Sequence, residues 1–179
     1  TPDVTWKALY KVESKEEHIE KYVIKGRFHE SVSQDILKSY LIVEYIIAHS
    51  YCHYPMYDEA LKKALTMVEM SIKLQCKAYD IPLTYLNKNN KRKNYPLGQL
   101  IDKIIKLGYP AELKNKIDRL REMRNIFLHP SRHSFGMGML RSPFPAIINT
   151  LNQIFLPLSY FHEKETKVLE IKAIEKQLN

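Results

Sequence analysis

Residues 112–130 read ELKNKIDRLREMRNIFLHP, and this stretch indicates both the fold class and a candidate site. Projected at about 100° per residue, its apolar side chains fall on one side of a helix. This stripe consists of Leu113, Ile117, Leu120, Phe127 and Leu128. Arg124 falls inside the stripe, one turn beyond Leu120, where a hydrophobic side chain is expected. Pro130 ends the helix, because the residue before a proline is disfavoured in the α region.

A guanidinium inside an apolar stripe needs a partner, because desolvating an unpaired charge costs several kcal/mol. The partner is a carboxylate, an anionic ligand, or water in a groove between two protomers. Glu69, at the edge of the apolar stripe of an earlier helix, is the candidate carboxylate. The alternative for Glu69 is an intrahelical pair with Lys73, which is common at this spacing and worth only tenths of a kcal/mol.

The rest of the chain is dominated by helical periodicity interrupted at proline and glycine. Further helices are expected at residues 31–51, 56–79, 97–106 and 144–160. The apolar face of the first of these is expected to contain Ile36, Leu37, Tyr40, Leu41, Tyr45 and Ala48. These patterns predict an all-α bundle in which short loops join antiparallel neighbours.

The domain organisation follows from the same patterns. Residues 31–179 are expected to form a single helical domain, preceded by an N-terminal extension over residues 1–30. Within the domain, residues 87–95 (NKNNKRKNY) are polar and basic and are expected to form a loop.

The composition is that of an ordinary globular chain with an excess of positive charge. Among the 179 residues, 45% are hydrophobic and 27% are charged, and the formal net charge is +8. This charge suits a polyanionic partner such as nucleic acid. Cys52 and Cys76 lack the spacing of a disulfide framework, which favours free thiols in a reducing cytoplasm. The longest charge-free stretch, residues 142–162, contains polar residues and prolines, so we expect a cytoplasmic protein with no membrane span.

Arg124, Asn125 and His129 form a cluster that suits RNA transesterification. A neutral imidazole accepts the proton of a ribose 2′-hydroxyl near neutral pH. A guanidinium binds phosphate with a planar fork and stabilises the charge that develops there, while an amide orients the imidazole or the ribose. This chemistry needs no metal, because the nucleophile is the hydroxyl of the substrate itself.

The same residues carry a resemblance to a known family. Residues 124–130 (RNIFLHP) resemble the R-(polar)-x-x-x-H motif of HEPN domains (higher eukaryotes and prokaryotes nucleotide-binding). Residues 67–73 (MVEMSIK) resemble the E-apolar-apolar-K pattern of the family's long helix. Residues 97–100 (LGQL) resemble its short helix after the loop, and residues 120–123 (LREM) resemble its lead-in to the motif. The resemblance covers approximately residues 31–160.

The resemblance implies a HEPN-like bundle of long antiparallel helices that forms a homodimer with its motif helices facing each other. In active members of the family, the paired Arg and His line a metal-independent ribonuclease cleft. For this chain it implies that Arg124 and His129 are catalytic and that Asn125 supports them, with RNA as substrate and no cofactor. It further implies a toxin or phage-defence effector, with a cognate antitoxin or other inhibitor protein as a partner.

Other charged residues are candidates for supporting roles. Arg121 lies one turn before Asn125 and is a candidate phosphate contact, the alternative being a solvated surface side chain. His133 follows the motif directly and is expected near the cleft. Four basic residues of the expected loop are candidates for steering RNA, the alternative being an ordinary soluble surface: Lys88, Lys91, Arg92 and Lys93.

A metal site is rejected as the primary interpretation of the histidines. His49 and His53 have the i,i+4 spacing of metal ligands, and Cys52 lies between them. His129 and His133 have the same spacing. A zinc site needs a third ligand and usually a fourth, and prolines interrupt or follow both pairs.

Two interpretations without catalysis stay open. In the first, the chain is a non-catalytic HEPN-like module that binds RNA, a nucleotide or a protein through the same groove. In the second, it is a structural bundle in which Arg124 is buried in a salt bridge, while Asn125 and His129 only satisfy carbonyls at the helix end. Truncation of Arg124 would then cost several kcal/mol of stability.

Overall fold

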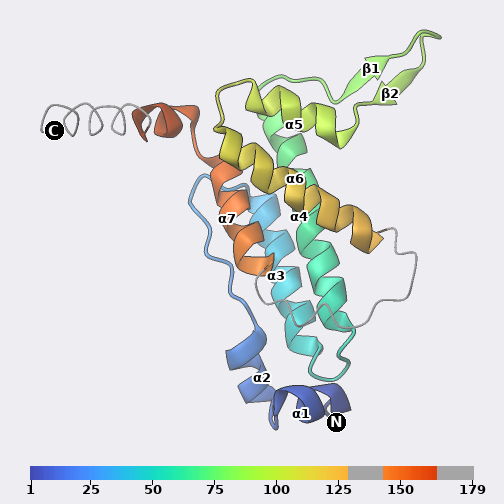
Figure 1. Cartoon of the computed structure of the whole chain (residues 1–179), viewed down its shortest axis with the longest axis vertical. Helices are drawn as coiled ribbons and strands as arrows, with labels where there is room; N and C mark the ends of the chain where they lie inside the picture. The colour runs from blue at the N-terminus through green and yellow to red at the C-terminus, as the bar shows by residue number, and fades with distance from the viewer. Residues whose placement is uncertain (129–142, 165–179) are drawn as a thin grey trace, which may run out of the picture.

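The structure, a computed structural model, describes residues 1–128 and 143–164 (Figure 1). These residues form mainly α-helices, with one two-stranded sheet, which confirms the all-α part of the prediction. The helices are α1 (Val4–Tyr10), α2 (Lys15–Tyr22), α3 (Gln34–His49), α4 (Met56–Ala78), α5 (Leu97–Ile105), α6 (Ala111–Leu128) and α7 (Pro143–Phe155). The long helix α4 is central, because α3, α5, α6 and α7 all contact it.

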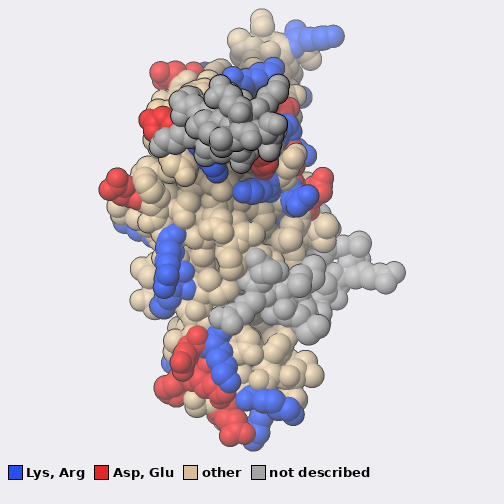
Figure 2. Space-filling view, turned by 60° about the vertical axis from the view of Figure 1, so that its left-hand side comes forward, with Lys and Arg blue, Asp and Glu red and all other residues tan. Residues whose placement is uncertain are grey.

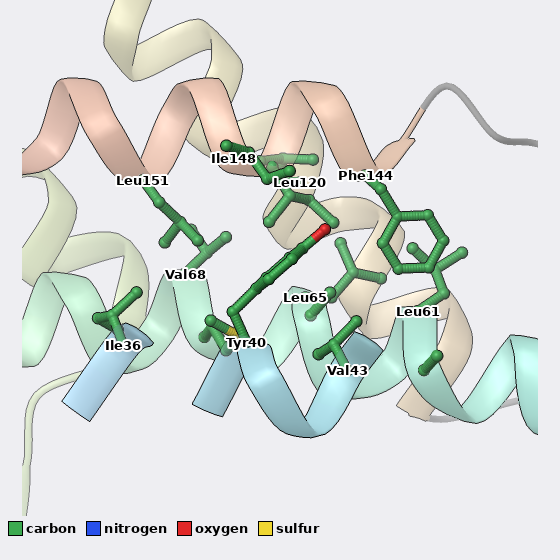
Figure 3. Close-up of a cluster of buried hydrophobic side chains, with 14 of the residues drawn as sticks. Ile36, Tyr40, Val43, Leu61, Leu65, Val68, Leu120, Phe144, Ile148 and Leu151 are labelled. Carbon is green, nitrogen blue, oxygen red and sulfur yellow. The ribbon is translucent and has the colours of Figure 1, made fainter. Parts of the chain in front are cut away.

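The core lies between α4 and the helices around it. Figure 3 shows side chains of α3, α4, α6 and α7 meeting in one apolar cluster. Its labelled residues are all buried: Ile36, Tyr40 and Val43 from α3, Leu61, Leu65 and Val68 from α4, Leu120 from α6, and Phe144, Ile148 and Leu151 from α7. Burial of this apolar surface is the main stabilising contribution. Because Leu120 is anchored in the cluster, the next turn of α6 is held beside α4.

Helix α3 buries a narrower face than the sequence predicted. Ile36 and Tyr40 are buried as expected, together with Val43 and Ile47. The prediction was wrong for Leu41 and Tyr45, which are 51% and 60% exposed. The helix is apolar on more than one side, and the residues that it buries are spaced along one face: Ile36, Tyr40, Val43 and Ile47.

The first residues close the end of the α3–α4 pair (Figure 1). Trp6 of α1 is fully buried, and its Nε1 donates a hydrogen bond to the carbonyl oxygen of Ser50 at 2.5 Å. His18 of α2 is also fully buried, with its Nε2 3.3 Å from Ser50 Oγ. Trp6 belongs to the same apolar cluster as the core of residues 31–164, so the expected N-terminal extension shares that core.

The segment expected to be a loop is part of a β-hairpin. Strand β1 (Thr84–Leu86) pairs antiparallel with β2 (Arg92–Asn94), with Tyr85 opposite Lys93. Asn87 closes the turn, because its side-chain oxygen accepts hydrogen bonds from the backbone N–H groups of Asn89 and Lys91. Side chains of Asn stabilise turns in this way, and Asn87 was the readable signal for this hairpin. The hairpin projects from the bundle (Figure 1).

Helix α7 is shorter than predicted. The expected helix over residues 144–160 is divided, since α7 ends at Phe155 and residues 158–164 form a separate helical segment. Pro157 lies at the break and has no N–H to donate to the helix. Among the described residues, no helix combines the length and apolar character needed to cross a membrane.

Candidate functional site

Helix α6 places Arg124 against α4. Leu113, Ile117, Leu120 and Phe127 are buried as predicted. Leu128 is 37% exposed, contrary to the prediction, although Phe127 beside it is buried. Arg124 follows Leu120 by one turn within this stripe, and its side chain is 23% exposed. The guanidinium is therefore held at the edge of the core without being sealed inside it.

The guanidinium of Arg124 has two identified partners. Its Nη2 lies 2.5 Å from Oε2 of Glu69 on α4. Its Nη1 donates a longer hydrogen bond, 3.3 Å, to Oδ1 of Asn125. Nε is buried and has no acceptor among the described residues. Arg has five N–H donors, so N–H groups on Nη1 and Nη2 remain beyond these two contacts.

Glu69 makes both of the contacts that the sequence left as alternatives. Its Oε1 lies 2.6 Å from Nζ of Lys73, while Oε2 binds Arg124. One carboxylate thus bridges a cation of its own helix and a cation of α6. The bridge orients the guanidinium, because one edge of the planar group is fixed by an anion.

Arg121 is neither free nor fully solvated. Its Nη2 lies 3.3 Å from Oδ1 of Asp118, one turn earlier on α6. The guanidinium also packs against Gly98 at the start of α5, where a β-carbon would clash with Nη1. Arg121 therefore lies where the beginning of α5 meets the second half of α6.

Helix α6 also carries Asp118, an acidic residue that was not among the predicted site residues. Asp118 Oδ2 lies 2.7 Å from Nζ of Lys114, which also lies 3.2 Å from Oδ1 of Asp102 on α5. Hydrogen bonds to Asp118 and Asp102 raise the pKa of Lys114. The i,i+4 spacing of Lys114 and Asp118 was a readable signal. The contact with Asp102 was not, because it joins two helices.

Apart from Arg121, the predicted site residues fall into three groups. Glu69, Arg124 and Asn125 are brought together. The basic residues Lys88, Lys91, Arg92 and Lys93 lie on the β-hairpin, which projects away from the end of α6 (Figure 1). His129 and His133 lie outside the described residues, so their positions relative to Arg124 stay a prediction.

The histidine pair before α4 was considered as a metal site. His49 and His53 are both exposed, as is Cys52. His49 Nδ1 lies 2.8 Å from the carbonyl oxygen of Tyr45 and is engaged by its own helix. Over residues 1–128 and 143–164, no group of three or more His, Cys, Asp or Glu side chains is arranged to hold a metal ion.

Comparisons with known proteins give no family. No protein-family model matches the chain, and no significant match is found among curated proteins or solved structures. The interpretation of the site therefore depends on the residues themselves and on the motif resemblance.

Proposed function

We propose that this chain is a metal-independent endoribonuclease that cleaves RNA by 2′-hydroxyl transesterification. The observation that carries the proposal is the state of Arg124. It lies in the apolar stripe of α6, one edge is held by Glu69, and the side chain remains 23% exposed. A guanidinium that is oriented by an anion, on a side chain that stays partly exposed, suits phosphate binding.

The proposed reaction assigns a role to each residue of the motif. The imidazole of His129 takes the proton of the 2′-hydroxyl, whose oxygen attacks the adjacent phosphorus. Arg124 stabilises the negative charge of the pentacoordinate phosphate. The bond from phosphorus to the 5′-oxygen breaks, and a protonated imidazole returns the proton to that oxygen. The products are a 2′,3′-cyclic phosphate and a 5′-hydroxyl.

The proposal includes a homodimer through the motif helices. Asn125 and Ile126 are exposed at the end of α6, and Ile126 is 67% exposed. A single exposed apolar side chain is ordinary on a protein surface, so the homodimer rests on the motif resemblance. A toxin or phage-defence role, with an inhibitor protein as partner, is part of this proposal and rests on the motif resemblance.

The decisive variants are Arg124→Ala and His129→Ala, compared with the wild-type chain on total RNA in EDTA. We expect His129→Ala to abolish cleavage while RNA binding persists, and Arg124→Ala to impair both. Arg119→Ala is the matched control for Arg124, since Arg119 is exposed on the same helix, and His49→Ala is the control for His129. Equal cleavage by the wild type and by an Arg124→Ala/His129→Ala double variant would refute the proposal.

A second candidate function is a non-catalytic RNA-binding module. The observation that favours it is the hairpin, whose basic side chains are all exposed and can contact RNA without any catalytic group. Binding of RNA without fragments, at protein concentrations that saturate the RNA, would support the module and contradict the nuclease.

A further inference from the structure

The β1–β2 hairpin carries positive charge that no acidic side chain offsets. Between Ile81 and Ile101 the chain has four basic residues and no Asp or Glu. The four basic side chains are exposed, and within residues 1–128 and 143–164 none of them forms a salt bridge. Elsewhere several surface cations are paired, such as Lys21 with Glu17 and Lys25 with Glu44.

The space-filling view shows the same contrast. In Figure 2 the projecting tip at the top of the molecule carries basic side chains, whereas acidic and basic side chains mix at the opposite end. An uncompensated positive projection attracts a polyanion over about a Debye length, roughly 8–10 Å at physiological salt. Charge alone, however, does not distinguish among nucleic acid, an anionic membrane and an acidic protein.

An aromatic pair on the hairpin makes that distinction. The rings of Tyr85 and Tyr95 lie with their centroids 4.8 Å apart at an interplanar angle of 36°. Nζ of Lys103, from α5, lies 3.3 Å from the centroid of the Tyr95 ring. Tyr95 is therefore the inner, half-buried ring, and Tyr85, which is 36% exposed, is the outer one. Tyr85 therefore packs against Tyr95, whose ring is itself in contact with the ammonium group of Lys103.

A basic side chain lies beside this outer ring. Lys93 is directly opposite Tyr85 in the antiparallel register. Opposed residues of paired strands point to the same face, with their β-carbons about 4.5–5.5 Å apart. An aromatic ring with an ammonium group beside it matches the alternation of base and phosphate along an unpaired strand.

We propose that the β1–β2 hairpin binds single-stranded nucleic acid, with an unpaired base stacked on Tyr85 and an adjacent phosphate held by Lys93. Lys88, Lys91 and Arg92 add the longer-range attraction. The hairpin offers little for a membrane, because residues 87–91 (NKNNK) contain no apolar side chain and Leu86, 65% exposed at the end of β1, is a single aliphatic side chain.

The hairpin also leads toward the proposed site. Gly98, four residues after the end of β2, packs against Arg121, which lies one turn before Arg124 and Asn125 on α6. The inference rests on the proposed function in taking RNA as the natural ligand. Binding at the hairpin does not require cleavage, so a result that refutes one of the two proposals leaves the other untouched.

The test measures binding of the full chain to a labelled 12-nucleotide 2′-O-methyl RNA, which has no free 2′-hydroxyl and cannot be cleaved by transesterification. Tyr85→Leu should weaken binding roughly fivefold to a hundredfold, the range of loss of one stacked base. Lys93→Gln should weaken binding and reduce the salt dependence, with the slope of log K against log salt falling by about 0.7.

Matched controls separate the hairpin from the general charge of the surface. Tyr45→Leu removes an exposed Tyr of α3, and Lys38→Gln removes an exposed Lys of the same helix. Both should bind like the wild type, and all four variants should keep the wild-type unfolding midpoint. A duplex of the same sequence should bind more weakly than the single strand and should be insensitive to Tyr85→Leu.

Three results would overturn the inference. The first is a Tyr85→Leu variant that binds the single strand as tightly as Tyr45→Leu does. The second is equal binding of duplex and single strand, which would mean that the hairpin attracts nucleic acid only by its charge, without stacking of a base on Tyr85. The third is preferential binding to phosphatidylserine vesicles that the RNA does not displace. Cleavage of ordinary RNA by a chain that fails these binding tests would leave the nuclease proposal standing and remove only the role of the hairpin.

Discussion

At the scale of single residues, His18 makes the stability of the protein depend on pH. The ring is fully buried against Trp6, and its Nδ1 has no hydrogen-bond partner among the described residues. Burial disfavours the charged form and lowers the pKa of His18 to about 4. The unfolded chain, with an ordinary His pKa near 6.5, therefore binds a proton that the folded chain rejects.

This difference predicts that the folded state loses stability as the pH falls from about 6.5 toward 4. The contribution of His18 is fully present above pH 6.5 and decreases by up to about 3 kcal/mol below it, at 1.36 kcal/mol per pKa unit. Urea unfolding at pH 7, 6 and 5 measures the loss. A His18→Phe variant keeps a ring in the core and removes the titration, so its stability should vary less over this range. An unchanged pH dependence in that variant would contradict the assignment.

Arg124 and Glu69 should be coupled, but less strongly than a fully buried ion pair. Their side chains are 23% and 21% exposed, so water screens part of the interaction. We expect a double-mutant cycle with Arg124→Ala and Glu69→Ala to give a coupling of about 1–2 kcal/mol by urea unfolding. The coupling should decrease in 1 M NaCl.

The loss of stability in Arg124→Ala alone separates two roles of Arg124. A purely structural arginine, sealed against its carboxylate, should cost about 3–5 kcal/mol when truncated. A loss of that size for Arg124→Ala, with RNA binding and cleavage unaffected, would identify the residue as part of the fold alone.

At the scale of elements, α3 shows which side of an apolar helix contributes to the free energy of unfolding. Ile47 is fully buried, whereas Leu41 is 51% exposed. Ile47→Ala should lower the free energy of unfolding by about 2–5 kcal/mol, because it leaves a cavity in the core. Leu41→Ala should change it by no more than about 0.5 kcal/mol. Equal losses in chemical denaturation would mean that Leu41 is covered in solution by another surface.

The elements also show where sequence patterns are sufficient. The 56–79 prediction agrees with α4, because a long amphipathic pattern bounded by proline is a strong signal. The hairpin was missed, because its strands are only three residues each and its turn depends on the side chain of Asn87. The two-sided apolar surface of α3 was misassigned, because periodicity within one helix does not say how many neighbours will cover it.

At the scale of the whole molecule, the candidate site was only partly predictable. The position of Arg124 in an apolar stripe required a partner, and Glu69 was one of its candidates. The simultaneous contact of Glu69 with Lys73 and Arg124 depends on how α4 and α6 pack, which the sequence does not specify. The same is true of Tyr85 and Tyr95, which are brought together only by the hairpin register.

The most direct test of the proposed function is the product chemistry of RNA incubated with the purified wild-type chain in EDTA. The account predicts fragments that end in a 2′,3′-cyclic phosphate and begin with a 5′-hydroxyl. It also predicts no cleavage of a 2′-O-methyl RNA of the same sequence, since that substrate lacks the nucleophile. Intact RNA under these conditions, or fragments with 5′-phosphate ends, would contradict it.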